Sequence, residues 1–153
     1  MRYGRRGFSL VELLVVMAII AIILAVAVPI MSKARLNAVE TMVVQEMHTI
    51  GQAQTQYQSQ FGKYASTLAE LAPPANGGVD GPNAAHLIPP SLASGEKDGY
   101  LFVLTANAGG YTVVASPKVF GSTGRRTFFL DQDGIIHQNW GQELASVESP
   151  EFK

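Results

Sequence analysis

The feature that most constrains the fold is an apolar segment near the start of the chain, residues 13–31, which contains no charged and no strongly polar side chain. As an α-helix rising about 1.5 Å per residue it would measure roughly 28 Å, close to the hydrocarbon thickness of a bilayer. Arg2, Arg5 and Arg6 lie before it, with no acidic residue among them. The positive-inside tendency therefore predicts a cytoplasmic N-terminus, with everything after Met31 on the other side of the membrane.

The rest of the composition limits the class of protein. A chain of 153 residues has room for one domain and a short appendage. Its 11 basic and 12 acidic residues give a formal charge of −1, and beyond the N-terminal arginines the basic residues are not gathered on any later segment, so we expect no nucleic acid partner. Because cysteine is absent, disulfides, thiolate zinc sites and thiol nucleophiles are excluded.

Three export routes can explain the apolar segment, and they predict different mature proteins. An ordinary Sec signal peptide would end at Ala25, Val26 and Ala27, so that the mature chain begins at Val28. A twin-arginine signal would use Arg5 and Arg6. In the third route the cut falls between Gly7 and Phe8, the apolar helix is kept, and Glu12 becomes the fifth residue of the mature chain.

Glu12 and the sequence after Met31 favour the third route. An acid in an apolar helix costs up to about 2.5–3.5 kcal/mol at the membrane centre, and less near the interface, so it indicates a function, and a discarded signal would gain nothing from it. An apolar stripe at intervals of three and four residues also continues the helix: Val39, Val43, Met47, Ile50, Gln54, Tyr57 and Phe61. Cleavage at Ala27 would cut this helix, in which we expect a kink at Pro29.

These residues carry a family resemblance. The stretch RRGFSLVELLVVMAIIAIILAVAVPIMSKA resembles the start of a type IV pilin-like protein, with a basic leader ending in Gly, then Phe, Glu four residues later, and Pro near the end of a long apolar helix. A second stretch, YQSQFGKYASTLAEL, is similar to the helix exit of major pseudopilins and related pilins. Ala65 departs from that pattern, in which a proline often follows the tyrosine.

The resemblance implies a route to a filament. A prepilin peptidase would cut between Gly7 and Phe8 and methylate the new amine of Phe8. An assembly platform protein of the inner membrane would then bring subunits into a helical homopolymer, together with minor pilins or pseudopilins. The carboxylate of Glu12 could pair with the Phe8 amine of a neighbouring subunit, where loss of one partner would leave a buried charge. The alternative is an acid that lies at the interface beside Arg5 and Arg6.

Loss of residues 1–7 removes three arginines and moves the formal charge from −1 to −4. Beyond the leader we expect a transmembrane and filament-core helix over residues 8–31 and an extracytoplasmic domain over residues 32–153. Within that domain the expected order is helix 32–64, loop 65–99, sheet 100–140 and tail 141–153. The loop is rich in Pro and Gly, with at most short helical turns at residues 84–88 and 90–93.

Strands are expected at residues 100–105, 111–116 and 127–130, with a fourth at 135–138, and hairpin turns at residues 107–110 and 131–134. The predicted fold class is α+β. A long N-terminal helix has a membrane-spanning first half and an amphipathic second half, and the second half packs on an antiparallel sheet of three to four strands.

No catalytic site, cofactor site or metal ligand is predicted. His48, His86 and His137 fall in three different settings, and nothing places a serine and an acid around any of them. Asp131 and Asp133 open a sequence like a calcium loop, but the closing glutamate is not at the required spacing, so a hairpin turn is the simpler interpretation. The sequence does not decide whether calcium binds near these two residues.

Charged and aromatic residues of the domain receive structural interpretations. Lys33, Arg35, Glu40 and Glu46 are interpreted as a solvated helix face, with contacts between staggered subunits as the alternative. Trp140 is interpreted as an anchor in the core or at the domain edge. The aromatic side chains at the end of the helix are expected to pack beneath the sheet: Tyr57, Phe61 and Tyr64.

We therefore expect a structural filament subunit that is not an enzyme, held in the inner membrane by one span before it joins a periplasmic pseudopilus or a surface pilus. The absence of cysteine favours a major-pseudopilin-like subunit of a type II secretion system. A surface type IV pilin for motility, adhesion or DNA uptake is the alternative. From another class, the alternative is a periplasmic binding protein or enzyme exported by a Sec or Tat signal.

Overall fold

The computed structural model describes residues 7–107 and 109–153, so the leader arginines lie outside the described residues. The chain divides into two units, Met1–Arg35 and Leu36–Lys153. Helix α1 (Leu10–Phe61) includes residues of both units and continues past Pro29. The kink at Pro29 stays a prediction. In the first unit the helix is long and apolar enough to cross a membrane, by length and composition.

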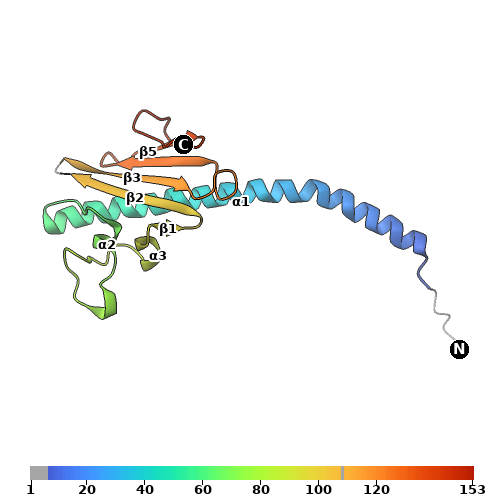
Figure 1. The fold of residues 1–153 in the computed structure, drawn as a ribbon, viewed down its shortest axis with the longest axis horizontal. Helices are drawn as coiled ribbons and strands as arrows, with labels where there is room; N and C mark the ends of the chain where they lie inside the picture. Colours follow the sequence, from blue (N-terminus) through green and yellow to red (C-terminus); the bar gives the residue numbers. More distant parts are fainter. Residues whose placement is uncertain (1–6, 108) are drawn as a thin grey trace. The chain divides into compact units, whose positions relative to one another are not determined.

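The second unit contains a sheet in which neighbours in sequence are neighbours in space (Figure 1). Among the described residues it has five antiparallel strands: β1 (Glu96–Lys97), β2 (Tyr100–Asn107), β3 (Gly110–Pro117), β4 (Arg126–Asp131) and β5 (Ile136–Trp140). This confirms the α+β class. The additional strand, β1, has two charged residues with little strand propensity and pairs only with the start of β2, which explains why the sequence did not predict it.

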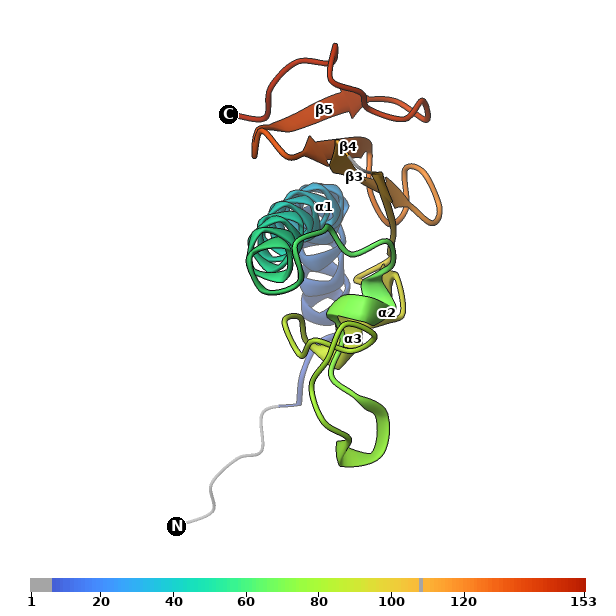
Figure 2. The same cartoon turned by 90° about the vertical axis from the view of Figure 1, so that its left-hand side faces the viewer.

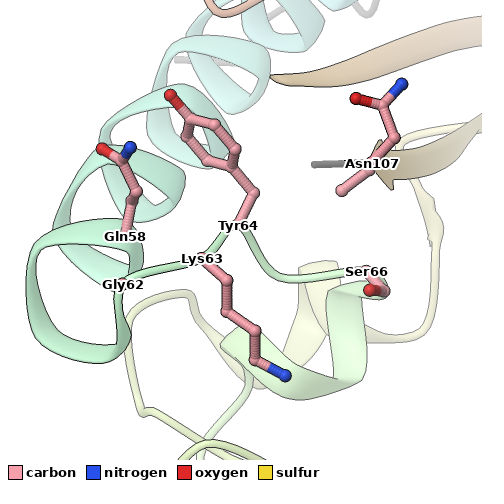
Figure 3. A pocket seen from close by; sticks show the side chains of 7 residues that line it. Gln58, Gly62, Lys63, Tyr64, Ser66 and Asn107 are labelled. Carbon is pink, nitrogen blue, oxygen red and sulfur yellow. The ribbon is translucent and has the colours of Figure 1, made fainter. Parts of the chain in front are cut away.

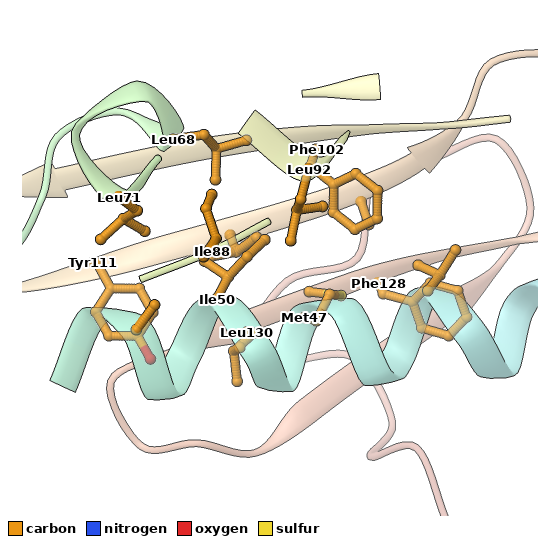
Figure 4. Packing of buried hydrophobic residues seen from close by; sticks show 14 of the residues in the cluster. Met47, Ile50, Leu68, Leu71, Ile88, Leu92, Phe102, Tyr111, Phe128 and Leu130 are labelled. Atoms are coloured by element: carbon orange, nitrogen blue, oxygen red, sulfur yellow. The ribbon is translucent and has the colours of Figure 1, made fainter. Parts of the chain in front are cut away.

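The second half of α1 covers one face of this sheet (Figure 2). Met47, Ile50 and Tyr57 of the predicted stripe are fully buried, and Val43 nearly so. Strand β2 alternates between buried and exposed residues along its first half, as expected when one face is covered and the other is open. Figure 4 shows the helix residues among Phe102, Phe128 and Leu130 of the strands. Each such side chain contributes about 1.5–3 kcal/mol when it is fully buried.

Residues 65–99 are tied to the core more closely than a surface loop. They contain α2 (Leu68–Leu71), the 3₁₀ helix η1 (Ala75–Gly77) and α3 (Pro90–Ala93). Leu71, Ile88 and Leu92 are buried, and the carbonyl of Leu71 accepts from the main chain of both Leu87 and Ile88 (2.7 and 3.0 Å). This pairing holds residues 84–88 in a non-helical form in which His86 has a φ of 57°, so a helical turn is found at α3 but not at residues 84–88.

Gln54, the polar member of the apolar stripe, clamps the chain just after the helix. Its side-chain amide donates to the carbonyl of Ala65 and accepts from the Ala65 main chain, both at 2.8 Å, and the side chain is fully buried. The helix ends at Phe61, three residues earlier than the expected end at residue 64, because Gly62 adopts a left-handed conformation with φ of 72°. The polar position therefore fixes how the chain leaves α1.

We predict that a fragment beginning at Ser32 folds as a soluble monomer. Removal of the exposed apolar helix discards the surface that would aggregate, while the stripe from Val39 to Phe61 still covers the sheet. Circular dichroism and sedimentation velocity measure the outcome. An unfolded or obligately oligomeric fragment would contradict the described core.

Candidate functional site

The start of α1 is the first candidate site, since both ends of the predicted cleavage junction and Glu12 lie there. The main-chain N–H of Ser9 donates to Glu12 Oε2 (3.0 Å), and the Ser9 hydroxyl accepts from the main chain of Val11 (3.3 Å). Ser9 and Glu12 thus form a capping box, a helix-start motif with Ser three residues before Glu. The sequence analysis did not identify this motif, although Ser9 and Glu12 have the spacing that it requires. The Glu12 carboxylate is directed toward the end of the helix where Phe8 lies.

The surface that follows has no partner from its own chain among the described residues. The most apolar 18-residue window of α1 has a mean hydropathy of 3.2 and none of it is buried. Large apolar side chains such as Leu14, Ile19 and Ile23 are each at least half exposed. An apolar surface of this size needs either lipid or other protein around it.

Glu40 is the clearest correction to the sequence analysis. It was predicted on a solvated face, and it is fully buried. Its Oε1 accepts from the main chain of Arg125 (2.8 Å), and its Oε2 accepts from Arg126 Nε (2.8 Å) and lies 2.6 Å from Nη2 of the same guanidinium. Position 40 lies three residues before Val43, on the helix side that faces the sheet, so the start of β4 supplies its partners. This is a paired buried charge that fixes the helix on the sheet.

The Glu40 pair also affects Tyr100, which lies beside it at the start of β2. Burial, and then the negative charge of Glu40, raise the pKa of Tyr100 well above its ordinary value. The hydroxyl therefore stays protonated and donates to the carbonyl of Arg126 (2.9 Å). Burial likewise raises the pKa of Tyr111 to about 12, at the other end of the sheet.

The other charges of the helix fall into two groups. Glu46 is half-buried and pairs with Lys97, which attaches β1 to α1, so the solvated-face prediction is also wrong for Glu46. Lys33 and Arg35 are exposed, as predicted. For these two residues, contacts with neighbouring subunits stay a prediction.

The aromatic residues divide in the same way. Tyr64 packs on the ring of Tyr111 in β3, as expected beneath the sheet. Tyr57 is buried and donates to the carbonyl of Pro82 (2.6 Å), and Phe61 packs on its ring, so these contacts are with α1 and the segment 65–99. Trp140, the last residue of β5, is 62% exposed and so lies at the domain edge, not in the core.

The three histidines are not brought together. His48 is exposed on α1, His86 lies 3.6 Å from Asp80 on the surface, and His137 Nδ1 is 2.6 Å from the carbonyl of Ser149. Within residues 7–107 and 109–153, no group of three His, Asp or Glu side chains is placed to hold a metal ion. Asp131 instead accepts a hydrogen bond from the main chain of Asp133 (3.0 Å) in the β4–β5 turn.

A hollow of about 390 Å³ lies where α1 ends (Figure 3). Of the described residues that line it, Lys63 is the only one with an ionisable side chain apart from the hydroxyl of Tyr64, and amide, hydroxyl and small side chains complete the lining. Its described lining residues include no carboxylate and no imidazole. The prominent surface of this chain is the apolar helix.

A long N-terminal apolar helix whose second half packs on an antiparallel sheet is a pilin-like arrangement. Residues 2–28 match the prokaryotic N-terminal methylation motif. The chain is also 32% identical over 146 residues to the type IV wide pilus major component PilA4 of Thermus thermophilus, with 94% of this chain and 95% of that protein covered. No solved structure matches the chain significantly.

This protein belongs to the type IV pilin-like family. The relative and the motif indicate a structural pilin, and the apolar helix is consistent with membrane anchoring and pilus assembly.

We predict that Glu40→Gln lowers the free energy of unfolding by about 3–5 kcal/mol, because it leaves the Arg126 guanidinium without its buried counter-charge. Glu46→Gln is the matched control on the same helix, and its partly exposed pair should cost about 1 kcal/mol or less. Urea unfolding of both variants measures the difference. Equal losses would show that burial of Glu40 does not set the strength of its pair.

Proposed function

We propose that this protein is a polymerising structural subunit of a type IV pilus-like filament and has no enzymatic activity. The observation that carries the proposal is the start of α1, where a carboxylate turned toward Phe8 precedes an apolar helix that the described residues of its own chain leave uncovered. The methylation motif over residues 2–28 supports the same conclusion.

The proposed sequence of events begins with cleavage between Gly7 and Phe8. This step removes three arginines and creates a positively charged amine at Phe8, one residue before the N–H group that Glu12 already binds. The methylated amine stays basic, so it remains a partner for a carboxylate. In the filament the apolar helices of neighbouring subunits surround each other and replace the lipid.

Glu12 then has a role that depends on assembly. Within one subunit it caps its own helix, which satisfies one N–H group. Between subunits we propose that it neutralises the Phe8 amine of a neighbour. In the low dielectric of packed apolar helices, an amine without this partner would cost about 3–5 kcal/mol, and the cost would recur with every added subunit.

Two kinds of filament are compatible with this role, a periplasmic pseudopilus and a surface pilus. The absence of cysteine supports the pseudopilus of a type II secretion system. The similarity to a wide pilus major component supports a surface pilus. Electron microscopy of material sheared from cells distinguishes them, because a surface pilus is recovered there in long filaments at normal expression and a periplasmic pseudopilus is not.

We predict that the mature protein begins at a methylated Phe8. Intact-mass analysis of protein extracted from membranes should show loss of residues 1–7 and the added methyl mass. A mature protein that begins at Val28 would support an ordinary signal peptide, and retention of the leader in cells with an active prepilin peptidase would contradict processing.

We predict that Glu12→Ala and Glu12→Gln both abolish filaments while membrane insertion and processing continue. Glutamine keeps the capping geometry and loses the charge, so it separates the two roles of Glu12. Glu12→Asp should give an intermediate yield, since the shorter side chain stretches the pair. The measurement is filament yield relative to the processed membrane pool.

The matched control is Ser9→Ala, which removes the hydroxyl that binds Val11 and keeps the charge of Glu12. It should cost about 1 kcal/mol of helix stability and leave filaments present. Normal filament yield from Glu12→Gln would overturn the charge-pairing role and leave Glu12 as a helix cap.

A further inference from the structure

One end of the sheet carries exposed aromatic and apolar side chains next to basic ones. Arg126 pairs with Trp140 in the sheet register, so the β3–β4 loop and the end of β5 meet at this end. Trp140 is 62% exposed, Val119 55% and Phe120 40%. Together with Arg125, these three residues form what we call the aromatic-basic surface.

The arginines hold Trp140 in place at the edge of the core. The Arg126 guanidinium lies 4.6 Å from the centre of the Trp140 ring and that of Arg125 lies 5.6 Å from it. Glu40 pairs closely with Arg126 and also lies 3.8 Å from Arg125 Nε, so one carboxylate serves two guanidinium groups and one positive charge is left over. Arg125 also donates to Asn37 of α1 and keeps about a third of its side chain exposed. The surface therefore combines an indole ring with a partly exposed cation.

Chain connectivity limits how far this surface can be from a membrane. Asn37, which binds Arg125, follows the last apolar residue of the spanning segment, Met31, by six residues. Six residues reach roughly 20 Å when fully extended and roughly 9 Å as a helix. Lys33 and Arg35 lie between them and add two more exposed cations.

We propose that the aromatic-basic surface binds the headgroup layer of an anionic phospholipid membrane while the subunit waits to be assembled. Tryptophan is enriched at this depth because its ring has an apolar body and a polar N–H group, and exposed basic residues are attracted to anionic headgroups. Lys118, the remaining basic residue of the β3–β4 loop besides Arg125, is already paired with Glu96 (2.6 Å), so Arg125 supplies the charge. The proposal rests on the proposed function, since it requires that residues 13–31 span the membrane.

Such binding would orient the globular unit before assembly. A subunit that leaves the membrane for a filament must then release Trp140 and Arg125 from the lipid. This contact would add to the cost of extracting the apolar helix, and it would end once the subunit is in the filament.

The fluorescence of Trp140 measures this membrane contact directly, since Trp140 is the only tryptophan of the chain. The processed full-length subunit is placed at one copy per nanodisc of phosphatidylcholine and phosphatidylglycerol. Lipids with a nitroxide near the headgroup should quench Trp140 strongly, and acrylamide in the water should quench it weakly. Replacing phosphatidylglycerol with phosphatidylcholine, or Arg125 with Gln, should reduce the lipid quenching severalfold.

The control is the double variant Trp140→Phe, Val103→Trp, which moves the reporter to the open face of β2, where Val103 is 58% exposed. This reporter should show the opposite pattern, with strong quenching by acrylamide and weak quenching by lipid. Equal lipid quenching at both positions would overturn the proposal. Protection of Trp140 that arises only with several copies per disc would also overturn it, in favour of a contact between subunits.

These outcomes are separate from those that test the proposed function. A protein that is not retained in nanodiscs, or that forms no filaments in cells, contradicts the function itself. A retained, filament-forming protein whose Trp140 lies in water contradicts only the membrane contact.

Discussion

The burial of one face of α1 against the sheet is the interaction on which the rest of the globular unit depends. Val43, Met47 and Ile50 fill the space beneath the strands, and among the described residues no other helix of comparable length covers that face. The helices α2 and α3 have four residues each, which is too short to replace it. The helix whose first part is apolar enough to cross a membrane therefore also forms one side of the core.

Polar groups in this interface determine where the helix lies along the sheet. Apolar contacts alone tolerate sliding, because they are not directional. Glu40 is bound to β4 by Arg126, and Gln54 is bound by two hydrogen bonds to Ala65. These two positions lie nearly four helical turns apart: Glu40 fixes the helix on the sheet, and Gln54 fixes the path of the chain that leaves the helix. A buried charge without Arg126 would cost more than the pair contributes, which makes the match specific.

A filament subunit must exchange one environment for another, and the charges of this chain are arranged for that exchange. Glu12 accepts a hydrogen bond from the main chain of Ser9 within the single chain, so the subunit that we propose needs no partner for this carboxylate before assembly. The apolar residues after it can contact lipid or protein with similar energy, since both exclude water. Trp140 lies in the unit Leu36–Lys153, and its exposed ring is at the domain edge, outside the hydrophobic core.

The sequence by itself determined the fold class, the apolar helix, its continuing stripe and the hairpin turns, because each depends on local periodicity or on residues that restrict the backbone. It also indicated Gly7, Phe8 and Glu12 through their order, and the family comparisons support that motif. The tertiary structure alone decided that Glu40 is buried, that residues 84–88 are not helical and that Glu96 and Lys97 form a strand. Each of these involves a partner far away in the chain: Arg126 for Glu40, Leu71 for Ile88, and Glu46 for Lys97. Periodicity carries no information about such partners. A charged residue on a helix is predicted to face solvent unless the position of its opposite charge, which lies elsewhere in the sequence, is known.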